Sequence, residues 1–122
     1  MSRSTILLFL LLTWLPGSAQ QPQEYHRIFY TTESGLPANG IKGMQWDEET
    51  GFLWIATEAG ISRFNGIDFK NFTIANTPFI ASERMAFMVK NNQGRIFTSD
   101  QYGNIFSINR NRLIYYGKKK NM

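Results

Sequence analysis

The feature that most constrains the fold is an internal repeat with a period of 43 to 44 residues. Residues 51–60 align with 94–103 at an offset of 43, and residues 61–72 align with 105–116 at an offset of 44. The paired positions are glycine opposite glycine or apolar opposite apolar: Gly51 and Gly94, Leu53 and Ile96, Trp54 and Phe97, Gly60 and Gly103, Ile61 and Ile105, Phe64 and Ile108, Phe69 and Leu113, Phe72 and Tyr116. A repeat of about 40 to 50 residues with four short strands is typical of a β-propeller blade. The period therefore predicts an all-β chain with two four-stranded antiparallel blades, an incomplete β-propeller.

Short apolar runs between turn-forming residues predict the individual strands. In Gly51–Gly66, Gly60 lies where a hairpin needs a positive φ, and Asn65-Gly66 is the pattern of a two-residue hairpin loop. The segment 25–32 is expected to form a strand at a sheet edge or to complete a neighbouring sheet. The other expected strands are 41–46, 52–55, 61–64, 67–72, 85–89, 95–99, 105–108 and 112–116.

The first 19 residues have the layout of a secretory signal peptide. Arg3 gives a short positive region, residues 6–15 are apolar, and small residues precede a cleavage point after Ala19. The alternative is an uncleaved membrane anchor, but ten residues on a helix rise about 15 Å, half of a hydrocarbon core of about 30 Å. We therefore expect a mature chain in a periplasm or outside the cell.

Charge is divided unevenly between the two halves of the mature chain. Residues 20–83 hold four Lys or Arg against eight Asp or Glu, whereas residues 84–122 hold eight against one. A basic end can indicate a nucleic acid or an anionic polysaccharide, or it can be a solvated surface. The charges interleave with strand residues, which favours the solvated surface, and no nucleic-acid partner is expected. The chain has no cysteine, which excludes a disulfide framework, a thiolate metal site and a cysteine nucleophile.

These features divide the chain into five segments. They are a signal peptide at 1–19, an N-terminal arm and strand at 20–34, a blade with the strong repeat at 35–74, a second, degenerate blade at 75–117, and a basic, truncated tail at 118–122.

The first blade carries a motif that resembles the two-component regulator propeller repeat. The family's pattern is roughly G-L-P-x-N-x-V, then D-x-x-G-x-L-W-I-G-T, then G-L-x-R-[YF]-[DN]-G and a terminal aromatic residue. Residues 35–72 follow it almost position by position, whereas 82–116 has Phe97-Thr98-Ser99 at the tryptophan strand and lacks the G-L-P start. The matching positions, expected to be structural, are Gly35, Leu36, Pro37, Asn39, Asp47, Gly51, Leu53, Trp54, Thr57, Gly60, Phe64 and Gly66.

The resemblance implies the N-terminal periplasmic sensor part of a membrane-bound hybrid two-component histidine kinase or regulator. Such a domain is expected to sense a polysaccharide-derived ligand, and its partners would be further propeller blades and a membrane-bound signalling module. Any kinase activity would lie in sequence outside this chain. Two stacked blades would expose two apolar faces, so we expect an N-terminal fragment of a longer protein. The alternatives are a non-functional truncated product, or a small unit that completes a ring as a homo-oligomer.

No residue pattern predicts a catalytic site, a cofactor or a metal centre, and no residue is assigned to ligand contact. His26 is expected to have a packing or surface role, and Asp47, Glu48 and Glu49 are expected to be solvated turn acids, because EF-hand spacing is absent. Trp46 and Trp54 could stack on sugar rings but are expected in the blade core. An exported propeller enzyme, a lyase or a hydrolase, is the alternative function; it would need acids converging from several blades.

Overall fold

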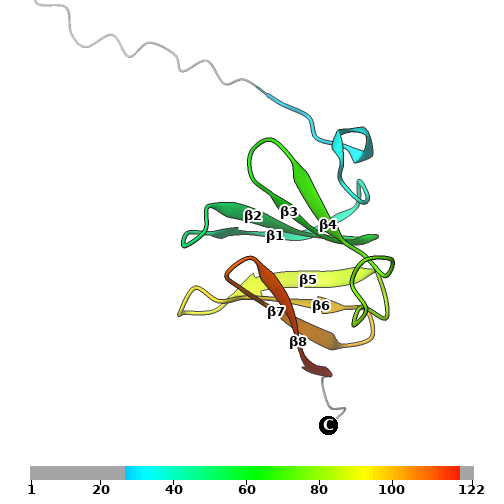
Figure 1. The fold of residues 1–122 in the computed structure, drawn as a ribbon, viewed down its shortest axis with the longest axis vertical. Helices are drawn as coiled ribbons and strands as arrows, with labels where there is room; N and C mark the ends of the chain where they lie inside the picture. The colour runs from blue at the N-terminus through cyan, green and yellow to red at the C-terminus, as the bar shows by residue number, and fades with distance from the viewer. Residues whose placement is uncertain (1–26, 119–122) are drawn as a thin grey trace, which may run out of the picture.

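The computed structural model describes residues 27–118, which form two four-stranded antiparallel sheets lying one above the other (Figure 1). The prediction of an all-β chain with two four-stranded antiparallel sheets is confirmed. In each sheet the strands are neighbours in chain order, as tight turns between short apolar strands dictate. The first sheet holds β1 (Ile41–Asp47), β2 (Phe52–Thr57), β3 (Gly60–Phe64) and β4 (Phe69–Phe72), and the second holds β5 (Met85–Lys90), β6 (Ile96–Asp100), β7 (Asn104–Asn109) and β8 (Arg112–Lys118).

Several predictions fall outside the described residues. They are the signal peptide with its cleavage point after Ala19, the first part of the arm with His26, and the tail beyond Lys118. Lys118, assigned to that tail from the sequence, is the last residue of β8.

The strand expected at 25–32 does not form over the part that the structure describes. Residues 27–31 pair with neither sheet, and Thr32–Ser34 form a single 3-10 turn, η1. The Tyr30 ring packs edge-on against Phe64 and Phe69, at centroid distances of 4.9 and 5.6 Å. Tyr30 therefore packs on the outer face of the first sheet, and the backbone of residues 27–31 adds no strand to that sheet.

The loop after β3 is also longer than predicted. Phe64 pairs with Phe69, so the loop has four residues, 65–68, and β4 begins at Phe69 rather than Ile67. Asn65 Oδ1 accepts hydrogen bonds from the backbone N–H groups of Ile67 and Asp68 at 2.8 and 2.7 Å. This side-chain turn competes with the two-residue hairpin that Asn-Gly favours.

The predicted turn at Gly60 is confirmed, with φ at +126°. Thr57 closes it: its Oγ1 donates to the Gly60 carbonyl at 2.8 Å and accepts from the Ala59 N–H at 3.1 Å. In the second sheet the corresponding residue is Asp100, which is buried. Its carboxylate accepts the N–H groups of Tyr102 and Asn104 and the Asn104 side-chain amide, at 2.7 to 2.9 Å.

Strand pairing reproduces the repeat except near the end of β8, where a register shift pairs Ile105 with Gly117, although its counterpart Ile61 pairs with Phe72. Leu53 pairs with Phe64, and its counterpart Ile96 pairs with Ile108; Phe64 pairs with Phe69 as Ile108 pairs with Leu113. The offset thus changes from 43 to 44 between β6 and β7, where residues 101–103 replace the two-residue turn of the first sheet. Even the register shift in the first strand pair recurs, at Ile41/Gly43 and at Met85/Phe87.

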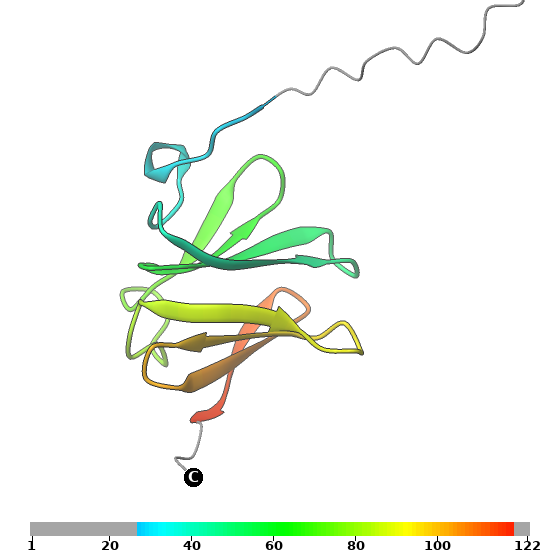
Figure 2. The same ribbon diagram turned by 180° about the vertical axis from the view of Figure 1, so that it is seen from behind.

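The core lies between the two sheets, where β1 and β5 face each other (Figure 2). Paired residues share a face and alternate residues point to opposite faces, which defines an inner and an outer face for each sheet. The core side chains on the two inner faces are Trp54, Ala56, Ile61 and Phe72 of the first sheet and Met88, Ile96, Phe106, Ile108 and Leu113 of the second. Ile80, from the segment between the sheets, and Met85, at the start of β5, join them.

Gly43 lets the two innermost strands approach closely. A Cβ atom added there would lie 2.9 Å from the backbone nitrogen of Met88. Trp54 is fully buried, as predicted. Trp46 is 51% exposed on the outer face of the first sheet, so its predicted place in the core is wrong. Trp46 pairs with Leu53, which precedes Trp54 in β2. Successive residues of a strand point to opposite faces, so Trp46 lies on the face opposite to Trp54.

Candidate functional site

The motif residues of the first blade organise turns and core, and the structure does not bring them together at one surface. Asn39 Oδ1 accepts the Thr32 N–H at 2.9 Å, which ties η1 to the strand that follows. Leu36 and Trp54 are buried, and Gly35, Gly51 and Gly66 have positive φ in three separate turns. Each of these contacts stays within the local backbone or the core, so the motif describes how the blade folds.

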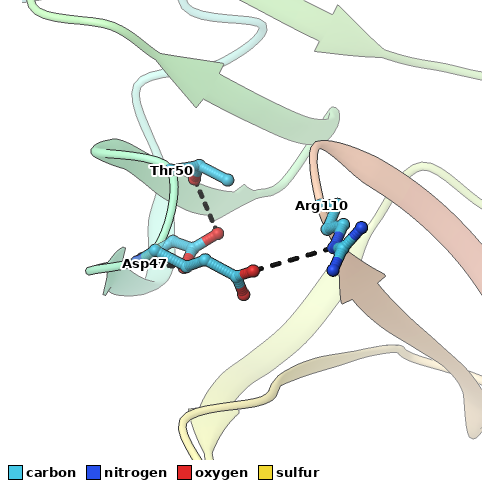
Figure 3. Close-up of polar contacts among 4 residues, drawn as sticks. Asp47, Thr50 and Arg110 are labelled. Carbon is cyan, nitrogen blue, oxygen red and sulfur yellow. Dashed lines mark hydrogen bonds and ion pairs between the residues drawn. The ribbon is translucent and has the colours of Figure 1, made fainter.

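A polar rim joins the two sheets at the end where β1 meets β2. Glu49 Oε1 lies 3.7 Å from Nε of Arg110, which stands in the turn between β7 and β8 (Figure 3). Asp47, in the same turn as Glu49, accepts the Thr50 hydroxyl at 2.7 Å and the Glu49 N–H at 3.1 Å. Both members of the ion pair are well exposed, so the pair contributes on the order of 1 kcal/mol or less.

Of the rim acids, Asp47 holds its own turn, whereas Glu49 is exposed and reaches Arg110 of the other sheet. Residues 27–118 bring together no group of three or more His, Cys, Asp or Glu side chains that could hold a metal ion. In the turn after β5, Asn91 Oδ1 likewise accepts hydrogen bonds from the backbone N–H groups of Gln93 and Arg95. The rim therefore offers hydrogen-bonding groups to solvent without a preformed cluster.

A groove of about 600 Å³ opens between β4 of the first sheet, β8 of the second sheet and the segment that connects the two sheets. Phe72 and Leu113 form its apolar floor, and the exposed rings of Phe79 and Tyr115 stand at its wall. Phe106 packs between these two rings, at centroid distances of 6.0 Å from Phe79 and 5.7 Å from Tyr115. The two aromatic walls are thus held by a shared buried ring.

Two cationic side chains, Lys70 and Arg112, complete the groove lining from opposite sheets. Lys70 Nζ lies 5.5 Å from the centroid of the Phe72 ring. Asn76 is already occupied: its amide donates to the Asn71 carbonyl at 2.7 Å and its Oδ1 accepts from Thr73 and Thr77. The groove therefore combines aromatic rings with two cations, neither of which forms an ion pair within residues 27–118.

Sequence reasoning missed the groove because its residues come from three segments with no common motif. One signal was present: the groove residues are places where the second copy departs from the first. Phe79 stands at the position of Gly35, Arg112 at that of Asp68 and Tyr115 at that of Asn71, each at an offset of 44. At these three positions the second copy thus has aromatic or basic side chains where the first has a glycine, an acid and an amide.

Comparisons with known proteins give a likeness of fold to solved structures. No family model matches the chain, and no curated protein matches it. Among solved structures, the "extracellular domain of the putative one component system BT4673 from B. thetaiotaomicron" matches with a TM-score of 0.54 at 15% identity. The match covers 88% of this chain and 15% of that one, so this chain spans a small part of the neighbour's length. At this identity the likeness shows the fold; the resemblance to the two-component regulator propeller repeat stays a prediction.

Within residues 27–118 no helix has the length and apolar character needed to cross a bilayer.

Proposed function

We propose that this chain is part of an exported β-propeller sensor domain whose groove binds a polysaccharide-derived ligand for a two-component or one-component signalling system. Three observations support the proposal: the signal-peptide layout of residues 1–19, the propeller-type repeat, and the fold likeness to an extracellular domain. The observation that carries it is the aromatic and apolar lining of the groove, whose volume lies within the range of small-molecule sites, about 300 to 1,000 Å³. The hollow at the polar rim is of similar volume, about 610 Å³, but its lining has no aromatic residue.

The chemistry of the groove favours an acidic oligosaccharide. Exposed aromatic rings such as Phe79 and Tyr115 offer flat apolar surfaces on which the faces of sugar rings can pack. Arg112 and Lys70 are suited to carboxylates, because charged hydrogen bonds are about twice as strong as neutral ones, and a guanidinium can bind a carboxylate with two parallel bonds. A chain of uronic acid residues presents both features at once.

Binding can be tested with the purified chain by calorimetric titration against oligogalacturonate and against a neutral oligosaccharide of equal length. Tyr115→Ala and Arg112→Gln should each weaken oligogalacturonate binding about tenfold or more, which corresponds to about 1.4 kcal/mol. Tyr102→Ala and Arg95→Gln are matched controls, because these exposed residues do not line the groove and should leave affinity unchanged. Equal loss in the control variants, or binding unaffected by all four changes, would reject the groove as the site.

The same mixtures distinguish the enzyme alternative. An exported lyase or hydrolase would shorten the oligosaccharide during incubation, and a sensor module would leave its length unchanged. That the chain lacks enzymatic activity remains a prediction until such an incubation has been analysed by mass spectrometry.

A further inference from the structure

Each sheet presents an apolar outer face. On the second sheet, Phe87, Val89, Ile114 and Tyr116 are exposed, and Phe97 packs edge-on against Tyr116 at 5.6 Å. On the first sheet the exposed side chains are Met44 and Trp46. Apolar groups gathered on one face in this way mark a surface that another protein surface covers.

The repeat shows what shape of surface fits each outer face. The residues that the first sheet turns inward onto the second are equivalent to the outer residues of the second sheet: Trp54 to Phe97, Ile61 to Ile105 and Phe72 to Tyr116.

The opposite equivalence holds as well. The residues that the second sheet turns inward are equivalent to the outer residues of the first: Met88 to Met44, Ile96 to Leu53, Ile108 to Phe64 and Leu113 to Phe69. The two outer faces are therefore equivalent to the two halves of a contact that the chain already makes once within itself. Tyr30 packs on Phe64 and Phe69, so at that part of the first sheet a second contact would include the Tyr30 ring or displace it. One position differs: Phe87 stands where Gly43 does, so a second contact would be wider at the innermost strands.

Charge favours the same pairing and opposes the alternatives. Residues 20–83, which include the first sheet, have an excess of four acids, and residues 84–122, which include the second, have an excess of seven basic residues. At long range, the half of one copy that holds the second sheet is thus attracted to the half of another copy that holds the first, and like halves repel each other. The arrangement opposes a symmetric contact of like faces and favours a head-to-tail one.

We infer that the outer faces bind a second copy of this chain, with the β5–β8 sheet of one copy on the β1–β4 sheet of the next. A head-to-tail contact closes into a ring when its rotation permits. Two to four copies would supply the roughly four to eight blades of a closed propeller. This inference does not depend on a ligand, because the groove lies between the sheets of one copy.

Two double variants test the inference, each placing lysines on one outer face. Met44→Lys/Trp46→Lys changes the first sheet, and Phe87→Lys/Val89→Lys changes the second; all four side chains are exposed and none lines the groove, so folding should survive and the ligand site is untouched. Circular dichroism and thermal unfolding of each variant check that it does. Lysine is used on both faces so that the altered faces repel each other.

Sedimentation velocity over a hundredfold range of concentration gives the readout. The unchanged chain should form species larger than a monomer, and each variant alone should stay monomeric, because its intact face finds only altered partners. An equimolar mixture of the two folded variants should form dimers and stop there, since only one intact contact can be made. A monomeric unchanged chain, a variant that dimerises alone, or a mixture that grows beyond dimers would overturn the inference.

Discussion

Replacing Gly43 by alanine should loosen the contact between the two sheets. The added Cβ would lie 2.9 Å from the Met88 backbone nitrogen and 3.2 Å from the Met88 Cβ, and ordinary contact begins at 3.4 Å, so β1 and β5 must separate by about 0.5 Å. A gap of about 0.5 to 1 Å forfeits a quarter to a half of the dispersion energy of each contact across it. We expect Gly43→Ala to lower the free energy of unfolding by about 1 to 3 kcal/mol, the usual cost of overpacking.

Gly40→Ala is the matched control. Neither glycine has a positive φ, and the Cβ added at Gly40 would meet the end of the Glu58 side chain, which can rotate away. Both changes restrict the unfolded chain equally, so the difference between the two variants isolates the contact between the sheets. Urea unfolding followed by the fluorescence of buried Trp54 measures both. A Gly43→Ala protein as stable as Gly40→Ala would show that the innermost strands are not tightly packed and would refute the reasoning.

Three further changes have defined outcomes. Export through a bacterial periplasm should yield a mature chain beginning at Gln20, and Ala19→Arg should abolish that cleavage, as read by intact mass. Arg110→Asn with Asn111→Gly should raise the free energy of unfolding by up to about 1 kcal/mol in urea titration, because both residues have positive φ, which Asn-Gly adopts more easily, and the ion pair lost with Arg110 is exposed and weak; a loss of stability would contradict this. Trp54→Ala should lower the free energy of unfolding by about 3 to 5 kcal/mol. Trp54→Phe should lower it far less, because the indole N–H that it removes is buried and has no partner among the described residues. Equal losses in the two variants would indicate that this N–H has a partner.

The repeat predicts most of the fold because glycines and apolar residues at fixed spacing determine where strands and turns can form. The offsets of 43 and 44 coincide with the pairing of Leu53 with Phe64 and of Ile96 with Ile108. Local patterns fail where a more distant contact or a side chain intervenes. The apolar residues of 25–32 look like a strand, yet Tyr30 packs on the sheet.

The face of Trp46 and the groove could not be read from local patterns. An apolar residue at a strand position does not reveal which face it occupies until the register is known. Phe79, Arg112 and Tyr115 converge only when the two sheets are stacked, so their role depends on contacts between segments more than thirty residues apart. Their departure from the repeat was visible in the sequence, but its meaning required the geometry.

The turns closed by Thr57 and Asp100 show how the two copies could diverge without losing their shape. What the fold requires at this position is a buried oxygen that accepts backbone N–H groups, and a hydroxyl and a carboxylate both supply it. An exchange between these two residue types therefore preserves the turn. A duplicated blade can drift in this way until comparison by residue identity no longer recognises it, although each turn is still closed by the same kind of bond.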